Sequence, residues 1–176
     1  MSPRLRKLVL TAHVTCSVGW VGAVAAFLAL ASSALGSDDA QVVRAGYLAM
    51  DTIGAYVIVP FGVGSLAAGL VQSLGTEWGL LRHYWVVVKF VLTVGAMALL
   101  VLHMQLVRYL ASVAASTPLS TTDLRDLRIQ LVGDAAAALL VLLVATALSI
   151  FKPRGMTRRG RRARRREPSA ERTRDL

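Results

Sequence analysis

Two histidines and a lysine lie inside segments of the chain that are otherwise apolar. His13 lies in the first such segment, and Lys89 and His103 lie near the two ends of the third. An ammonium group in membrane hydrocarbon costs about 3 kcal/mol or more, unless it pairs, reaches the surface or lines a polar cavity. Three of the 20 basic residues are lysines, and a buried lysine, unlike arginine, can release its proton. Lys89 is therefore the first candidate for a functional residue.

These side chains fall at two depths. With a rise of about 1.5 Å per residue, His13 and Lys89 each lie about 8 Å from the same end of a helical bundle. His103 lies about 21 Å from Lys89 along one helix, so these two cannot share a site. One face of the first helix carries His13, Ser17, Trp20, Val24 and Phe27. A histidine one turn from a serine and two turns from a tryptophan could border a cofactor or ion pocket.

Composition and hydropathy are typical of an integral membrane protein. Of the 176 residues, 55% are hydrophobic and 17% are charged, and the mean hydropathy is +0.58. Four apolar runs cover residues 8–35, 47–74, 84–107 and 129–151. A helix of about 20 residues crosses a bilayer, and each run supplies that length. The runs lack the alternation of barrel strands. We therefore predict an all-α fold, a four-helix transmembrane bundle.

The basic residues predict which side of the membrane each loop faces. With the N and C termini both cytoplasmic, fifteen Lys and Arg residues lie inside and four outside, as the positive-inside rule requires. The expected location is a bacterial cytoplasmic membrane, crossed four times. Residues 152–176 are rich in arginine, so we expect a disordered cytoplasmic tail that touches anionic lipid rather than nucleic acid.

The segments between the helices are short, which predicts antiparallel neighbours in a compact bundle. Glycines along the second helix, among them Gly62 and Gly69, permit close approach of a neighbouring helix. Pro60 is expected to kink the same helix. The longest loop is expected over residues 112–128, with a capped helix start at 120–123.

A second group of ionisable residues is expected at the external side of the bundle. Asp51, His103, Arg108 and Asp134 fall near the external ends of the second, third and fourth helices. Because the membrane disfavours a lone charge, we expect an ion pair between Asp134 and Arg108 with a structural role. The sequence leaves open whether His103, Asp51 and Asp134 are functional or structural.

Residues of the first and third helices resemble those of known membrane proteins. His13, Trp20 and Gly22 stand in the frame His-x6-Trp-x-Gly, which is similar to the first helix of CopD-like and HemJ-like membrane proteins. Lys89, followed by apolar residues up to His103, looks like their lysine-bearing later helix. Over residues 4–151 the chain also resembles a family of small bacterial four-helix integral membrane proteins classed as a domain of unknown function.

The two resemblances imply different chemistry. Similarity to HemJ-like proteins implies a b-type haem near His13 and Lys89, serving porphyrinogen oxidation, whereas similarity to CopD-like proteins implies copper handling. His13 and His83 differ in depth by about 8 Å, a poor fit for two ligands of one iron. The expected haem site has His13 as the iron ligand and Lys89 as second ligand or propionate partner, with Trp20 and His83 nearby.

Other functions remain open on the sequence. The polar residues could form helix contacts in a non-catalytic membrane component, or the chain could be a small transporter subunit for ions or copper. Copper has weaker support, because Met97, His103 and Met104 lie on one helix without partners across the bundle. No nucleophile with a neighbouring base is apparent, so hydrolytic activity is not expected. The expected partners are lipid and either a second copy of the chain or a larger membrane complex.

Overall fold

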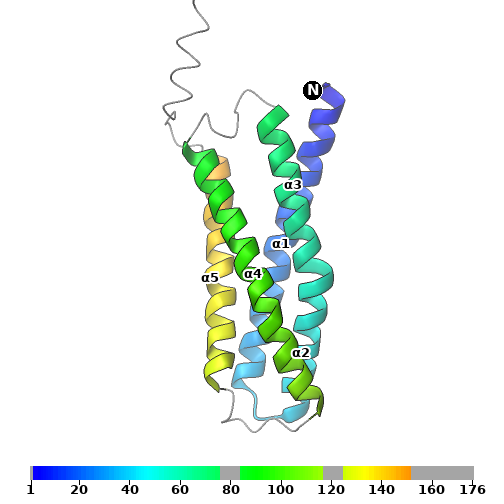
Figure 1. Cartoon of the computed structure of the whole chain (residues 1–176), viewed down its shortest axis with the longest axis vertical. Coiled ribbons are helices and arrows are strands. Elements are labelled where there is room, and N and C mark those ends of the chain that lie inside the picture. Colours follow the sequence, from blue (N-terminus) through cyan, green and yellow to red (C-terminus); the bar gives the residue numbers. More distant parts are fainter. Residues whose placement is uncertain (1, 76–83, 117–124, 152–176) are drawn as a thin grey trace, which may run out of the picture.

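The computed structural model describes residues 2–75, 84–116 and 125–151. Within these ranges the chain is almost entirely helical and contains no strand, which confirms the all-α prediction. The elements are α1 (Pro3–Gly36), α2 (Ala40–Ile53), the π-helical turn η1 (Gly54–Ile58), α3 (Val59–Gly75), α4 (Tyr84–Ser116) and α5 (Arg125–Phe151). Because α2, η1 and α3 follow one another without a break, they make one long helix beside the other three (Figure 1).

Four helices of the described part are long and apolar enough to cross a membrane. The spans are Pro3–Gly36, Ala40–Leu74, Val86–Val113 and Arg125–Phe151. They are antiparallel in sequence order: α1 and α4 begin at the end of the bundle where α3 and α5 finish (Figure 1). We call this end the His13 end and the opposite one the His103 end. The prediction of four helices that are long enough to span a membrane is thus confirmed.

The helices extend beyond the apolar runs because polar side chains cap them. Ser2 accepts a hydrogen bond from the backbone N–H of Leu5 at the start of α1. Asp39 accepts one from the backbone N–H of Gln41, at 2.8 Å, at the start of α2. Such caps satisfy amide groups that the first helical turn leaves unpaired, so polar flanking residues join the helix.

The third loop is shorter than the predicted range of 112–128. α4 continues to Ser116 and α5 begins at Arg125, with Asp126 in its first turn. The capped start predicted at residues 120–123 and the predicted tail at 152–176 lie outside the described residues.

Pro60 disturbs the second span through a π-helical turn just before it. Proline lacks the backbone N–H that an α-helix uses at every position. In η1 the helix widens, and the Val59 N–H bonds to the carbonyl of Gly54, five residues earlier. Such turns are a known response to an interrupted α-helical pattern. A Cβ at Gly54 would lie 2.5 Å from Met104 Sδ, so this glycine lets α4 pack closely on η1.

The well-packed core lies at the His103 end. α1 contacts α2, α3 and α5, and α4 contacts the same three helices. Buried side chains gather where these helices meet at that end: Ala31, Ala34, Val43, Tyr47, Met50, Val107, Leu110, Ala111 and Leu131.

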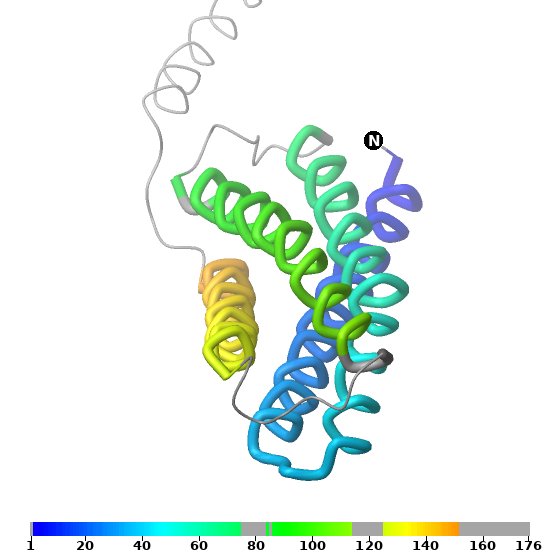
Figure 2. The backbone as a smooth tube through the Cα atoms, turned by 60° about the horizontal axis from the view of Figure 1, so that its bottom comes forward, coloured from blue at the N-terminus to red at the C-terminus, as the bar shows by residue number. Residues whose placement is uncertain are grey.

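The first half of α4 is much less tightly packed. None of its described side chains from Val86 to His103 is buried, and the buried ones begin at Met104. α4 runs obliquely, and its first turns diverge from α1 and α3 (Figure 1, Figure 2). The bundle is therefore tight at the His103 end, whereas at the His13 end α4 packs loosely beside α1 and α3.

A buried arginine joins three helices at the tight end. Arg128 on α5 is 5% exposed. Its guanidinium donates to the backbone carbonyl of Ala34, in the last turn of α1, and to the hydroxyl of Tyr47 on α2. The last carbonyls of a helix lack partners within it and carry partial negative charge. Arg128 therefore caps α1 while it ties α2 and α5 to it.

Replacing Tyr47 by Phe is expected to destabilise the protein, because it removes an acceptor from this buried guanidinium. A hydrogen bond to a charged group contributes about 1.5–3 kcal/mol, which corresponds to a drop of roughly 3–12 °C in the thermal midpoint. Circular dichroism in detergent measures the midpoint. Tyr56→Phe is the matched control, since the Tyr56 side chain is 79% exposed. Equal midpoints for the two variants would contradict the role given to Tyr47.

Candidate functional site

The His13 imidazole lies between α3 and α4, and both of its ring nitrogens have partners. Nδ1 lies 3.0 Å from the backbone carbonyl oxygen of Ser65, and Nε2 lies 3.5 Å from Lys89 Nζ. A carbonyl oxygen only accepts hydrogen bonds, so Nδ1 carries the proton and donates it. An ammonium group only donates, so Nε2 accepts from Lys89. The two residues whose depths matched in the sequence are therefore in contact.

Small residues of α3 allow this approach. A Cβ at Gly69 would lie 3.2 Å from His13 Cε1, and one at Gly64 would lie 2.8 Å from Cys16 Sγ. Between these glycines, Ser65 Oγ bonds to Ser17 Oγ at 2.8 Å. The glycine-rich face predicted to permit close helix approach thus gives α1 access to the Ser65 carbonyl. We call His13, Ser17, Ser65 and Lys89 the His13 site.

Trp20 closes the His13 site toward the middle of the bundle. It is 3% exposed, and a Cβ at Gly62 would lie 3.2 Å from its ring and 2.9 Å from Met97 Sδ. These three residues form an apolar layer, which we call the Trp20 layer. The indole Nε1 is buried and has no hydrogen-bond partner among the described residues. His83, also predicted for this site, lies outside the described residues.

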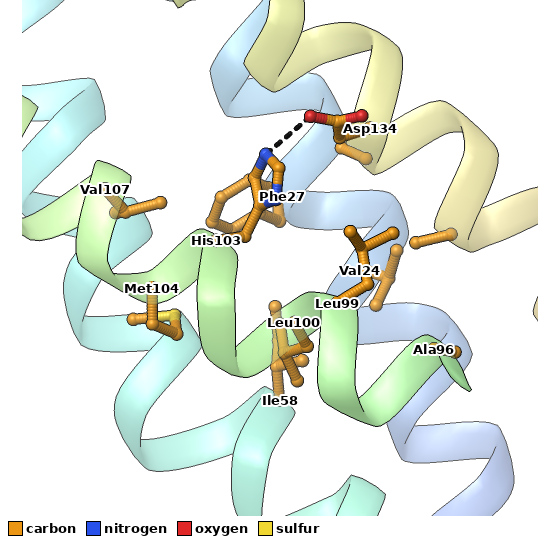
Figure 3. A pocket seen from close by; sticks show the side chains of 12 residues that line it. Val24, Phe27, Ile58, Ala96, Leu99, Leu100, His103, Met104, Val107 and Asp134 are labelled. Carbon is orange, nitrogen blue, oxygen red and sulfur yellow. Dashed lines mark ion pairs between the residues drawn. The ribbon is translucent and has the colours of Figure 1, made fainter. Parts of the chain in front are cut away.

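A second polar site lies on the other side of the Trp20 layer. His103 Nε2 on α4 and Asp134 Oδ2 on α5 are 2.7 Å apart (Figure 3). Both line a cavity of about 50 Å³. Its other walls are apolar: Val24, Phe27, Ile58, Ala96, Leu99, Leu100, Met104, Val107, Ala135 and Ala138. We call His103, Asp134 and this cavity the His103 site.

The predicted ion pair between Asp134 and Arg108 is wrong. Asp134 pairs with His103, and Arg108 Nε lies 3.7 Å from Asp51 Oδ1. Five residues along an α-helix correspond to a rotation of about 140°. His103 and Arg108 therefore point to different neighbours, α5 and α2, which the sequence of α4 alone does not identify.

The face of α1 predicted from spacing is an interior face. Its residues follow one another from the His13 site through the Trp20 layer to the cavity wall: His13, Ser17, Trp20, Val24 and Phe27. The sequence missed Ser65, whose backbone carbonyl orients His13. The feature of the sequence that could have identified Ser65 is a serine between two glycines in α3, a helix that contacts α1.

The orientation of His13 fits a metal ligand. Metal-binding histidines usually donate one ring N–H to a carbonyl or carboxylate and bind the metal through the other nitrogen. Nδ1 is held in this way by Ser65, and Nε2 has its lone pair turned toward Lys89.

The metal-binding side chains do not form a larger cluster. No group of three or more His, Cys, Asp or Glu side chains that could hold a metal ion occurs within 2–75, 84–116 and 125–151. Met97 packs at Gly62, whereas Met104 packs at Gly54 and lines the cavity with His103. Of the three soft or borderline ligands considered for copper, His103 and Met104 thus line one cavity, whereas Met97 lies in the Trp20 layer.

Comparison with protein-family models, with curated proteins and with solved structures found no match. The assignment of a function therefore depends on the geometry of the two sites.

The His13 imidazole is expected to be the Nδ1–H tautomer, because its Nδ1 faces a carbonyl oxygen. Nitrogen-15 NMR of histidine-labelled protein distinguishes this form from the Nε2–H form. Lys89→Met is expected to shift the His13 Nε2 resonance, since it removes the donor to that atom. Lys7→Met, at an exposed position of α1, is the control and should leave it unchanged. An Nε2–H tautomer would contradict the hydrogen-bond assignment.

Proposed function

We propose that this chain is a multi-pass protein of a bacterial cytoplasmic membrane that binds a b-type haem or related porphyrin at the His13 site and serves a redox reaction. His13 is the iron ligand, and Lys89 is the second ligand or the partner of a propionate group. Trp20 forms an apolar wall of the site, and His83 is a further candidate. The supporting observation is the hydrogen bond from His13 Nδ1 to Ser65, with Nε2 turned toward Lys89.

The loose packing of α4 supports this proposal. A porphyrin is a flat ligand of several hundred Å³, in the usual range for cofactor sites, and needs room between helices. The first half of α4 carries no buried side chain among those described, and it diverges from α1 and α3 (Figure 1). Lys89 joins α4 to α1 in this region through its contact with His13. A small outward shift of α4 would open the space beside both residues.

The chain's own residues would tune the group once it is bound. Haem supplies one-electron chemistry whose potential depends on the axial ligands and on hydrogen bonds to them. The Ser65 carbonyl fixes the His13 tautomer and ring orientation, which raises the basicity of Nε2. Lys89 brings a positive charge that can balance a propionate. The Trp20 layer keeps water and the polar groups of the His103 site away from the ligand.

The proposed orientation puts both termini in the cytoplasm, so the His13 end faces inward. The excess of Lys and Arg in the terminal segments and the second loop supports it. In this orientation the arginine-rich tail lies beside anionic lipid of the inner leaflet.

The competing candidate is a non-catalytic membrane component or a small ion-transporting subunit. Its support is that Lys89 already hydrogen-bonds His13 Nε2, so the pair is satisfied without a ligand. In this case the His13 site is a polar contact that joins α1, α3 and α4.

The two candidates differ in the absorbance spectrum of protein purified in mild detergent from haem-replete cells. The haem proposal predicts a Soret band that is lost in His13→Ala, because the iron ligand is removed. It predicts the band to persist in His103→Ala, the matched control, since that histidine lies beyond the Trp20 layer. Lys89→Met should shift the band without abolishing it. Colourless wild-type protein that takes up no haem on reconstitution would refute the haem proposal and favour the non-catalytic component.

The orientation is testable with single cysteines in a Cys16→Ser background. Asp38→Cys lies in the exposed connection between α1 and α2, and Ser2→Cys lies at the exposed start of α1. A membrane-impermeant maleimide applied to intact cells should label residue 38 and spare residue 2. After the cells are opened, both should react. Labelling of residue 2 alone in intact cells would reverse the orientation.

A further inference from the structure

The His103 site contains two buried polar atoms that lack a hydrogen bond. His103 Nε2 and Asp134 Oδ2 lie 2.7 Å apart as an ion pair, but neither atom has a hydrogen-bond partner among the described residues. Both side chains line the cavity of about 50 Å³ (Figure 3). Buried polar atoms are nearly always hydrogen-bonded, so each exception requires an explanation. A ligand that bonds to both atoms is such an explanation.

The apolar wall of the cavity favours an amphiphilic ligand over water. A buried water molecule needs about two to four polar partners arranged around it. The two polar side chains of this wall meet at one point, and all its other residues are apolar. A molecule with one polar group and an apolar body matches both parts of such a wall.

The cavity reaches the lipid-facing surface between α4 and α5. Leu99 on α4 lines the cavity and is 41% exposed, and it lies within the span Val86–Val113. Asp134 on α5 has a side chain that is 31% exposed. The wall residues contributed by α1 and η1 are all buried: Val24, Phe27 and Ile58. A ligand therefore has access from the membrane, between α4 and α5.

The volume of the cavity limits the ligand to one end of a longer molecule. About 50 Å³ is more than the roughly 30 Å³ that one water occupies in the liquid. It is far less than the volume of sites that enclose a whole ligand, which begins at about 300 Å³. The end of a chain fits, and the rest of the molecule lies along the lipid-facing surface.

The polar atoms and the route through lipid define the end group. A charged group is disfavoured in the hydrocarbon through which the ligand arrives, so the end group is neutral. A hydroxyl is neutral, and it both donates and accepts hydrogen bonds. It can therefore bond to the Asp134 carboxylate oxygen and to the His103 ring nitrogen together.

The π-helical turn η1 also supports a binding site here. Ile58, at the end of this turn, lines the cavity. A Cβ at Gly54, at its start, would meet Met104, another residue of the wall. Single π-helical turns within α-helices occur frequently at functional sites. The turn that accommodates Pro60 thus also shapes the cavity.

We propose that the His103 site binds a lipid alcohol, which is a linear apolar molecule that ends in a hydroxyl group. The hydroxyl bonds to His103 Nε2 and Asp134 Oδ2, and the first carbons of the chain fill the cavity. The rest of the chain leaves between α4 and α5. Binding does not depend on haem at the His13 site, because the Trp20 layer separates the two sites.

Photolabelling with azioctanol, an octanol that carries a diazirine ring, tests the proposal on protein in mild detergent. Light releases dinitrogen, and the carbene left on the reagent inserts into a neighbouring bond, so mass spectrometry of peptides identifies the labelled residues. Adducts are expected in segments 96–107 and 134–138, which line the cavity. Excess dodecanol should suppress them roughly tenfold more effectively than dodecane, which cannot form the hydrogen bonds. Equal suppression by dodecane and dodecanol would overturn the role of the hydroxyl.

Charged competitors of the same chain length distinguish a lipid alcohol from other amphiphiles. Dodecylamine and dodecanoate should each be roughly tenfold less effective than dodecanol, since a charged end is disfavoured in an apolar cavity. Stronger suppression by dodecylamine would overturn the proposal in favour of a cation site at Asp134. Stronger suppression by dodecanoate would overturn it in favour of an anion site at His103.

Two sets of variants test the position of the site. Combining His103→Phe with Asp134→Leu leaves an apolar wall, so dodecanol and dodecane should then compete equally. Ala138→Leu places a larger side chain in the cavity and should abolish the labelling that dodecanol suppresses. Ala137→Leu, at the exposed neighbouring position of α5, is the matched control and should keep it.

Labelling that dodecanol still suppresses in the double variant or in Ala138→Leu, as in wild type, would place the alcohol elsewhere and overturn the proposal. Circular dichroism of each variant verifies that it is folded. None of these measurements uses the Soret band, so the haem and lipid-alcohol proposals can fail separately.

Discussion

The inability of hydrocarbon to hydrogen-bond polar groups is the constraint on which this structure depends. Several polar side chains placed between the helices have their partner on another helix, and these contacts tie the bundle together. His13 reaches Ser65 on α3 and Lys89 on α4, His103 reaches Asp134 on α5, and other pairs join the remaining helices. Arg128 joins α5 to the end of α1 and to Tyr47 on α2. In lipid, where no water competes, such contacts and close packing replace the hydrophobic effect between helices.

The same constraint explains why the two ends of the bundle differ. At the His103 end, glycine at position 54 lets Met104 pack against η1, and the buried side chains of four helices meet. At the His13 end, α4 diverges, and the contact between Lys89 and His13 joins it to α1 across less tightly packed surroundings. Loose packing of α4 beside a pre-oriented histidine suits a bound cofactor, which is the function proposed for this end.

Much of the fold could be predicted from the sequence, because helix length and hydropathy are properties of local segments. The four spans, the contact of His13 with Lys89 and the interior face of α1 could be predicted from only the rise and rotation per residue.

Which side chains pair with each other at the His103 end could not be predicted in the same way. Whether Asp134 meets Arg108 or His103 depends on which faces of α4 turn toward α5 and α2, and this is fixed by packing of the whole bundle. Ser65 was not predicted as a site residue for a related reason. It contacts His13 through its backbone carbonyl, a group that every residue type carries. The helix ends shifted because caps such as Ser2 and Asp39 extend the helices past the apolar runs.

In the proposed haem site, Ser65 orients His13 so that Nε2 can bind an iron. The most direct measurement is the ratio of haem to protein chain, determined by extracting haem from purified protein after reconstitution with excess haem. We expect one haem for each wild-type chain and almost none for His13→Ala, with His103→Ala equal to wild type. A wild-type protein that retains no more haem than His13→Ala would contradict it.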